Sequence, residues 1–460
     1  MKYHITTYGC QMNTADSQRL ASELEKLGLC ATPDAEAADV VVLNTCVVRQ
    51  GPEDKAISRL MQLKPLKTKN PDVIFGVMGC LVGVREPKAL REKFPFVDTF
   101  LPPSDPSALV KLLQQRGVQA ETGREDYWLE RDATETRYAL QDADFILPAH
   151  ERGQLVSAHV PIIFGCNHVC TFCVIPYRRG AERSRSLGEI AAHARSLVAQ
   201  GVEEITLLGQ IVDRYGYDIP DGPRLPDLLR IIHDIDGLER LRFLTSHPNY
   251  LSDELLDTIA ELPKVCEHIE VPIQAGDDEV LRRMKRGYTV DDYRALIEKI
   301  RARVPNVSIA TDIIVGFPGE TEKQFQGTHD LLQELKLDVA HVAMYSPRPN
   351  TASASRFPDD VPHAEKERRR IAIDDLQSEV VGAINAKFLG QPVEVLVEEK
   401  HKTRWKGRTR NNKLVFFEDD TREWKGQLAH VKIYWTGPWS MLGTLEAHNA
   451  LTVSGNGSVH

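Results

Sequence analysis

The run AHVPIIFGCNHVCTFC, residues 158–173, decides how the middle of this chain is interpreted. Its first half, Ala158–Phe164, is apolar and predicts a β-strand, and three cysteines follow in the spacing C-x3-C-x2-C. Five further strand candidates come later, separated by helical patterns; they are Glu204–Leu208, Arg242–Thr245, Glu267–Val271, Val307–Ile314 and Asp338–Met344. Six such units in a row predict a partial α/β barrel over residues 151–381, with its active site at the carboxyl ends of the strands.

The three thiolates of this loop, Cys166, Cys170 and Cys173, are suited to three irons of a [4Fe–4S] cluster. The fourth iron then has no protein ligand and can bind a substrate. A structural zinc site needs four ligands, and an electron-transfer ferredoxin normally supplies four cysteines. His168 is a possible fourth donor, but it lies between the cysteines and is interpreted as a loop residue. The spacing therefore favours an open cluster at the mouth of the barrel.

Residues 1–117 repeat a second pattern, a strand that is followed by a cysteine. The strand candidates are Tyr3–Tyr8, Val40–Leu43 and Val73–Met78, and the cysteines after them are Cys10, Cys46 and Cys80. Helical patterns between them predict a parallel sheet, and the carboxyl ends of parallel strands meet at one edge. We expect the three thiols to gather there. The alternative is three independent buried cysteines, which is how we interpret Cys30 and Cys266.

The rest of the chain divides by composition. Residues 118–150 are polar and predict a linker, whereas short strands at Pro392–Glu398, Leu414–Phe417 and Leu428–Trp435 predict a small β-barrel over residues 383–447. Residues 448–460 are expected to form a frayed tail. Basic residues alternate along one stretch of the barrel and would share one face of a strand, with a tryptophan among them that could stack on a base; they include Lys402, Arg404, Lys406, Arg408 and Arg410, around Trp405. The alternative is a solvated barrel edge protected from aggregation by its charges.

The composition of the chain limits the number of domains, the compartment and the kind of RNA site that we expect. The chain has 460 residues, of which 42% are hydrophobic and 27% charged, so two to four soluble domains are expected. Its apolar stretches fall short of the roughly 20 residues that span a bilayer, and the N-terminus reads directly into a strand without a signal segment. We therefore expect a cytoplasmic protein, and its eight cysteines favour a metal or redox role over disulfides. The net charge of −9 means that any RNA site must be a local basic patch.

The C-x3-C-x2-C loop resembles the signature of the radical S-adenosylmethionine (SAM) superfamily, and the whole chain is similar to the methylthiotransferases within it. The segments that carry the resemblance are Gly9-Cys10-Gln11-Met12-Asn13, Asn44-Thr45-Cys46, Met78-Gly79-Cys80, Pro176–Gly180, Thr245–Pro248 and Tyr345–Pro349. The family branch that modifies a ribosomal protein usually reads Gly-Cys-Pro-Lys-Asn at the first of these, so the resemblance favours the tRNA branch. This chain departs from the family at Ile211-Val212-Asp213, Ala275 and Asn350, which concerns the polarity of the pocket.

The resemblance also implies an organisation and a set of cofactors. It implies an N-terminal methylthiotransferase domain at 1–117, a radical SAM core at 151–381 and a TRAM domain at 383–447. Two [4Fe–4S] clusters are implied, with an auxiliary one on Cys10, Cys46 and Cys80, together with SAM near Phe172, Gln210 and Gly316. Arg178 and Arg179 would bind the SAM carboxylate or tRNA phosphates, with a solvated charged loop as the alternative.

The implied reaction is the addition of a methylthio group to C2 of N6-isopentenyladenosine at tRNA position 37, next to the anticodon. The alternatives are another tRNA adenosine derivative, a ribosomal protein or, from a different class, a non-catalytic metal-stabilised RNA-binding protein. The expected partners are the anticodon stem-loop and an electron donor such as flavodoxin or ferredoxin, and we expect a monomer with no membrane association.

Overall fold

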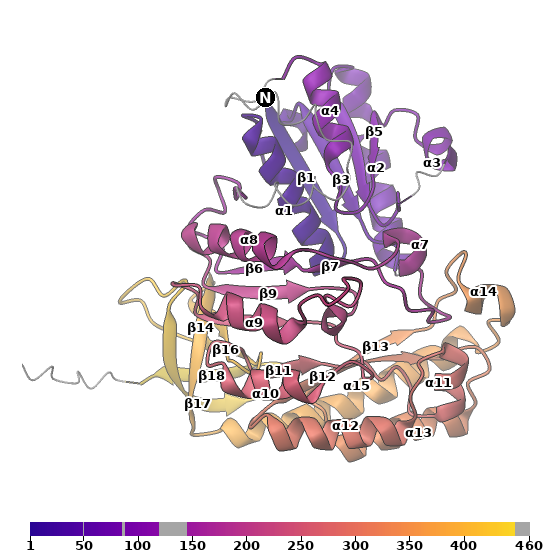
Figure 1. Cartoon of the computed structure of the whole chain (residues 1–460), viewed down its shortest axis with the longest axis vertical. Helices are drawn as coiled ribbons and strands as arrows, with labels where there is room; N and C mark the ends of the chain where they lie inside the picture. The colour runs from indigo at the N-terminus through magenta and orange to yellow at the C-terminus, as the bar shows by residue number, and fades with distance from the viewer. Residues whose placement is uncertain (49, 85–87, 119–144, 447–460) are drawn as a thin grey trace, which may run out of the picture. The chain divides into compact units, whose positions relative to one another are not determined.

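The computed structural model describes residues 1–48, 50–84, 88–118 and 145–446, and the rest of the chain lies outside the described residues. The predicted tail and most of the predicted linker fall in that undescribed part. The chain forms two compact units, Met1–Gln377 and Ser378–His460 (Figure 1), which are described separately below. Among the described helices, none has both the length and the apolar content that crossing a bilayer requires.

The first unit begins with a five-stranded sheet in the order β2-β1-β3-β4-β5, and all of its neighbouring strands are parallel. Its elements are β1 (Lys2–Tyr8), α1 (Gln11–Lys26), β2 (Cys30–Ala31), η1 (Ala35–Ala37), β3 (Val40–Thr45), α2 (Gln50–Lys69), β4 (Ile74–Gly79), α3 (Lys88–Lys93), β5 (Thr99–Leu101) and α4 (Ser107–Gln115). Every residue of β3 and β4 is buried, because α1 and α4 cover one face of the sheet and α2 covers the other. The predicted N-terminal parallel α/β domain is confirmed.

The same unit continues with six parallel strands that follow one another in chain order. They are β6 (Ser157–Pro161), β9 (Glu204–Leu208), β10 (Arg240–Phe243), β11 (His268–Glu270), β12 (Ser308–Val315) and β13 (Val339–Met344). They form two three-stranded sheets, β6-β9-β10 and β11-β12-β13, which are connected by a single bridge between Leu241 and Val265. The six-unit α/β core predicted from the sequence is confirmed.

Helices and short elements fill the spaces between these strands. They are β7 (Ile163–Phe164), α7 (Ile175–Arg179), β8 (Arg183–Ser184), α8 (Leu187–Ala199), η2 (Val212–Arg214), α9 (Leu225–His233), α10 (Asp253–Glu261), α11 (Asp278–Met284), α12 (Val290–Arg303), α13 (Glu322–Leu335), α14 (Ala352–Arg356) and α15 (His363–Asn385). The first predicted barrel strand is split, since after Pro161 the chain leaves β9 and β7 pairs with β8 instead.

The second unit contains the closed barrel β14-β15-β16-β18-β17. Its elements are η3 (Ala386–Phe388), β14 (Pro392–His401), β15 (Arg404–Arg408), β16 (Leu414–Phe417), β17 (Leu428–Thr436) and β18 (Met441–Leu445). Its core gathers the inward-facing side chains of all five strands, among them Val395, Trp405, Val415, Val431 and Met441. The predicted small barrel is confirmed, with β18 as a strand that the sequence pattern did not reveal.

Candidate cluster sites and the cavity beside them

The first candidate site brings together Cys10, Cys46 and Cys80, which follow β1, β3 and β4. The thiol of Cys46 is hydrogen-bonded to both of the others, so the three sulfurs gather at the carboxyl edge of the sheet. Cys10 is exposed there, whereas Cys46 and Cys80 are buried. The hydrogen bonds from Cys46 lower the pKa of Cys10 to about 6 and that of Cys80 to about 7, and the pKa of Cys46 itself is raised. Metal binding at this site would displace the protons that remain on the three thiols.

Two buried asparagines fix the loops that carry these cysteines. The Asn13 side chain donates to the Asn44 side chain at 3.0 Å and to the Thr45 carbonyl at 3.1 Å, and the Asn44 side chain donates back to the Asn13 carbonyl at 2.8 Å. Gly9 has φ +153°, and a Cβ there would lie 2.8 Å from the Cβ of Cys46. The glycines and asparagines beside the cysteines are therefore needed to bring the three loops together, a role that the sequence did not reveal for Asn13 and Asn44.

The second candidate site is the loop of Cys166, Cys170 and Cys173 at the mouth of the barrel. The loop is tied at its start by the Cys166 N–H, which donates to the Gly180 carbonyl at 3.0 Å, and Gly165 has φ +70°. Burial raises the pKa of Cys166 to about 11 and that of Cys173 to about 12, and Arg286 donates to the Cys170 sulfur at 3.3 Å. Three soft sulfur donors on one loop fit an iron–sulfur cluster, which must displace their protons to bind.

No three His, Cys, Asp or Glu side chains in the described residues converge closely enough to ligate one metal ion. The cysteines of a four-iron cluster bind different irons and do not need to converge in that way. His168, the possible fourth donor in the second loop, instead contacts the hydroxyl of Tyr250 at 3.0 Å and stacks on His247 at 4.5 Å. This agrees with its interpretation as a loop residue.

A cavity of about 920 Å³ lies against the second loop and extends to Val48, two residues after Cys46. Phe172 and Cys173 line it, as does Val48, whose N–H donates to the Cys46 sulfur at 3.4 Å. Asp312 and Met344 contribute polar and apolar walls from β12 and β13. The cavity is therefore lined by a cysteine of the second site and by a residue that contacts Cys46 of the first, and its volume suits a cofactor and a base together.

The sequence did not single out two carboxyl groups with raised pKa values, one at the end of β11 and one in η2. Burial, and then the neighbouring Asp312, raise the pKa of Glu270 to about 7. Burial raises the pKa of Asp213 to about 7, and both of its carboxylate oxygens accept from the His247 N–H, at 3.0 and 3.2 Å. Each carboxyl can be neutral near pH 7 and so can donate a hydrogen bond.

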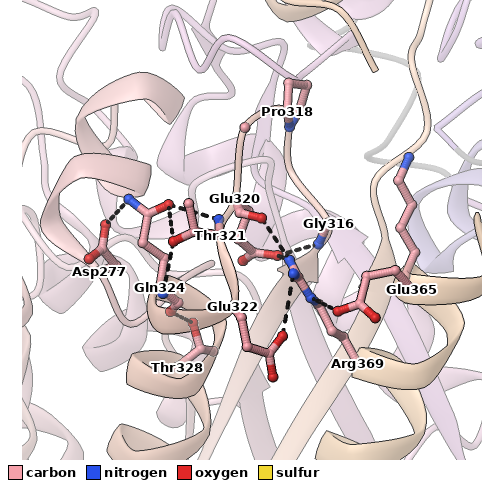
Figure 2. Close-up of polar contacts among 12 residues, drawn as sticks. Asp277, Gly316, Pro318, Glu320, Thr321, Glu322, Gln324, Thr328, Glu365 and Arg369 are labelled. Atoms are coloured by element: carbon pink, nitrogen blue, oxygen red, sulfur yellow. Dashed lines mark hydrogen bonds and ion pairs between the residues drawn. The ribbon is translucent and has the colours of Figure 1, made fainter. Parts of the chain in front are cut away.

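The predicted SAM contacts have different environments. Phe172 lines the cavity, whereas Gln210 and Gly316 are not among its lining residues, so their role stays a prediction. The Gly316 N–H donates to Glu320 at 2.6 Å, and Glu320 also accepts from Arg369 at 2.8 Å (Figure 2). A Cβ at Gly316 would lie 2.3 Å from the Lys366 side chain, which itself lines the cavity. Gly316 thus shapes this wall through Lys366.

Two predicted RNA contacts are wrong. Arg179 is buried in an ion pair with Asp16 and cannot reach a phosphate at the surface. Trp405 is 2% exposed and belongs to the barrel core, because alternation along β15 turns it away from the face of its basic neighbours. Arg178 is half-buried and its guanidinium lies 3.5 Å from the Leu81 carbonyl.

The basic residues predicted on and beside β15 lie at the surface, but three of them are paired with carboxylates. Lys402, Arg404, Lys406, Arg408 and Arg410 are exposed or half-buried. Arg404 pairs with Glu418 at 2.9 Å, Lys406 with Glu399 at 2.6 Å and Arg408 with Glu398 at 3.2 Å. The exposed aromatic side chains of this unit lie elsewhere, at Tyr434, Trp435 and Trp439.

Three segments of the chain match known families. Residues 160–332 match the Radical SAM superfamily, residues 2–102 match the family described as "Uncharacterized protein family UPF0004", and residues 386–445 match the TRAM domain. The barrel, the three-cysteine loop at its mouth and these matches define a radical SAM enzyme, a class that uses SAM and a [4Fe–4S] cluster.

Curated relatives identify the family within that class. The tRNA-2-methylthio-N(6)-dimethylallyladenosine synthase of Roseiflexus sp. (strain RS-1) is 45% identical over 462 residues, covering 100% of this chain and 92% of the relative. The protein of the same name from Herpetosiphon aurantiacus is 46% identical over 447 residues, covering 96% of this chain and 97% of the relative. The chain belongs to this family of methylthiotransferases. A solved structure of the radical SAM methyltransferase TsrM from Kitasatospora setae shares its fold, with a TM-score of 0.57, 17% identity and 77% of each chain covered.

Proposed function

We propose that this protein adds a methylthio group to C2 of N6-isopentenyladenosine next to the anticodon in tRNA, as the names of its relatives indicate for them. It would do so with two [4Fe–4S] clusters, one on Cys166, Cys170 and Cys173 and an auxiliary one on Cys10, Cys46 and Cys80. The observation that carries the proposal is the single cavity bordered by Cys173 and, through Val48, by Cys46. A reaction that joins a radical step to sulfur transfer needs both clusters at one substrate.

With SAM bound, the cluster of the second loop would supply the radical that removes hydrogen from C2, a position too unreactive for acid–base chemistry. The protein's own residues bind and shape the site. Phe172 offers a flat apolar surface for an adenine ring, and Met344 an apolar wall. Glu270 and Asp312, which repel each other when both are ionised, are able to hold one proton between them at neutral pH.

The proposed substrate base can enter the cavity without the opening of an RNA double helix. An anticodon loop is single-stranded, so that a base can be splayed into a cavity of this size. We further propose a monomer that acts in the cytoplasm and takes electrons from a flavodoxin or ferredoxin.

The test is to offer the reduced, reconstituted enzyme prenylated tRNA, the same tRNA without the prenyl group and the candidate ribosomal protein. We expect methylthio product, detected by mass spectrometry of nucleosides, on prenylated tRNA. Product on the ribosomal protein alone would contradict the assignment, whereas equal rates on both tRNAs would contradict only the prenyl requirement. The control is the Cys173→Ala protein, which should give no product on any substrate.

A further inference from the structure

A side pocket of about 740 Å³ lies next to the cavity in which the reaction is proposed to occur. Its lining comes from α2, α3 and α7, from the loop after β4 and from the turn after β13. Glu53 lines this side pocket, Arg348 lines the cavity, and the two side chains form an ion pair. The two spaces are therefore neighbours, with one ion pair in the wall between them.

Arg178 lines the side pocket with a guanidinium that the protein itself hardly uses. Its stem packs against Gly83, where a Cβ would lie 3.4 Å from the Arg178 Cδ. Among the described residues, the only acceptor of its guanidinium is the Leu81 carbonyl, 3.5 Å from Nη1, and the buried Nε–H has no partner. Leaving such donors unsatisfied is unfavourable, and a guanidinium matches the oxygens of a phosphate in both shape and charge. This side chain is therefore suited to an anionic ligand.

Tyr177, the residue before Arg178, also lines the side pocket and is 55% exposed. A single exposed ring means little by itself, because isolated apolar side chains are common at protein surfaces. Here the ring shares a pocket with Arg178 and with Lys93, which is exposed on α3. Glu53 adds a carboxylate to the lining, but Arg348 already neutralises it. An accessible ring beside cations is typical of sites for single-stranded nucleic acid, because bases stack on the ring and the cations neutralise phosphates.

We propose that the side pocket binds the nucleotide next to the target adenosine of the RNA, with its base stacked on Tyr177 and its phosphate bound by Arg178. This rests on the proposed function, which places the target base in the neighbouring cavity. Because RNA is a continuous chain, the nucleotides on either side of a base in the cavity must lie close to its opening. The isopentenyl group is a poorer occupant, since its five carbons would leave most of this volume empty and would make no use of the cations.

The test measures Kd by fluorescence anisotropy for the full-length, reconstituted protein and a prenylated anticodon stem-loop. The intact stem-loop is compared with two versions that each lack the base on one side of the target adenosine, and with an unprenylated version. The variants are Tyr177→Ala and Arg178→Gln. Tyr217→Ala is the matched control, because Tyr217 is 46% exposed but its ring is already in contact with Arg214, at 5.2 Å, and Arg224, at 4.5 Å.

We expect Tyr177→Ala to weaken binding of the intact stem-loop by about 5- to 150-fold, and to have no effect on one of the two stem-loops that lack a flanking base. Arg178→Gln should weaken binding of every RNA and reduce the slope of log Kd against log salt by about 1. Tyr217→Ala should leave Kd unchanged.

Wild-type affinity in Tyr177→Ala, or an equal loss of affinity for all four RNAs, would overturn the proposal. A loss that disappears only when the prenyl group is absent would assign the side pocket to that group and would also overturn it. Binding does not require catalysis. A wild-type protein that shows the expected binding pattern but forms no methylthio product would therefore refute the proposed function and not the role of the side pocket.

Discussion

Replacing Trp405 with alanine is expected to destabilise the C-terminal barrel, not to remove a platform for an RNA base. The indole is 2% exposed and packs with Val397 and Phe417 in the barrel core. Its N–H donates to the Asp419 carbonyl at 2.8 Å, so both the ring and its polar atom are used internally. Truncating a buried tryptophan costs about 3–5 kcal/mol, which is a large part of the roughly 5–15 kcal/mol that stabilises a typical domain.

The same unit supplies a matched variant with the opposite expectation. Trp439 is 62% exposed in the turn between β17 and β18, and the Asn385 side chain anchors that turn by donating to the Gly437 carbonyl at 2.8 Å. Trp439→Ala should change the free energy of unfolding by less than about 0.5 kcal/mol, as surface substitutions usually do. If the indole stacks on a base, its loss should weaken RNA binding by about 1–3 kcal/mol, or about 5- to 150-fold in Kd.

The assay pairs two measurements on each variant. Denaturant unfolding followed by circular dichroism gives the free energy of unfolding, and fluorescence anisotropy with an anticodon stem-loop at fixed salt gives Kd. Trp405→Phe, which keeps a ring but loses the hydrogen bond, should fall between wild type and Trp405→Ala. Wild-type stability together with lost RNA affinity in Trp405→Ala would refute the reasoning from burial.

Three other predictions follow from the sites. Cys173→Ala should abolish 5′-deoxyadenosine formation, whereas Cys46→Ala should retain SAM cleavage and lose methylthio transfer; wild-type product from Cys46→Ala would contradict the auxiliary-cluster assignment. Removing residues 386–460 should weaken tRNA binding and reduce its salt dependence while SAM cleavage survives, and an unchanged Kd would count against a role for the barrel in binding RNA. Burial raises the pKa of Asp213 to about 7, above its unfolded value near 4, so the folded state holds an extra proton between these values. The free energy of unfolding should therefore fall as the pH rises from about 4 to about 7, by at most about 1.4 kcal/mol per pH unit, and stay level above that. Asp213→Asn should reduce this fall, to which Glu270 also contributes, and an identical pH slope in both proteins, measured by denaturant unfolding, would contradict it.

The sequence correctly predicted the features that depend on a local pattern of residues, such as the strands and the cysteines at their ends. Apolar runs predicted β3 and β4, and the position of Cys46 and Cys80 just past those strands predicted that the thiols would gather, because parallel strands end at a common edge. The same period-two reasoning could have placed Trp405 correctly. If the even-numbered basic residues face solvent, then residue 405 faces the core.

Contacts between distant segments could not be predicted in this way. Arg179 and Asp16 are 163 positions apart in the sequence. A run of basic residues predicts an exposed arginine, and the buried partner that contradicts this prediction is found only in the folded structure. The contact of Arg286 with the Cys170 sulfur spans 116 positions and has no local signature. Buried ionic partners of a cluster are therefore the part of such a site that only the folded chain reveals.

These distant contacts explain how two cysteine sites on separate sheets are held beside one cavity. Arg179 holds the end of the second cysteine loop against α1 through Asp16, and Arg348, in the cavity wall after β13, pairs with Glu53 on α2. The two ion pairs therefore connect the barrel to the helices on either side of the N-terminal sheet. Because an arginine fork fixes direction as well as distance, each pair limits rotation of one domain against the other more than a purely apolar contact would. The proposed sulfur transfer depends on the separation between Cys46 and Cys173. Charge contacts to the helices on both faces of the N-terminal sheet help to hold that separation, together with the cysteine loops.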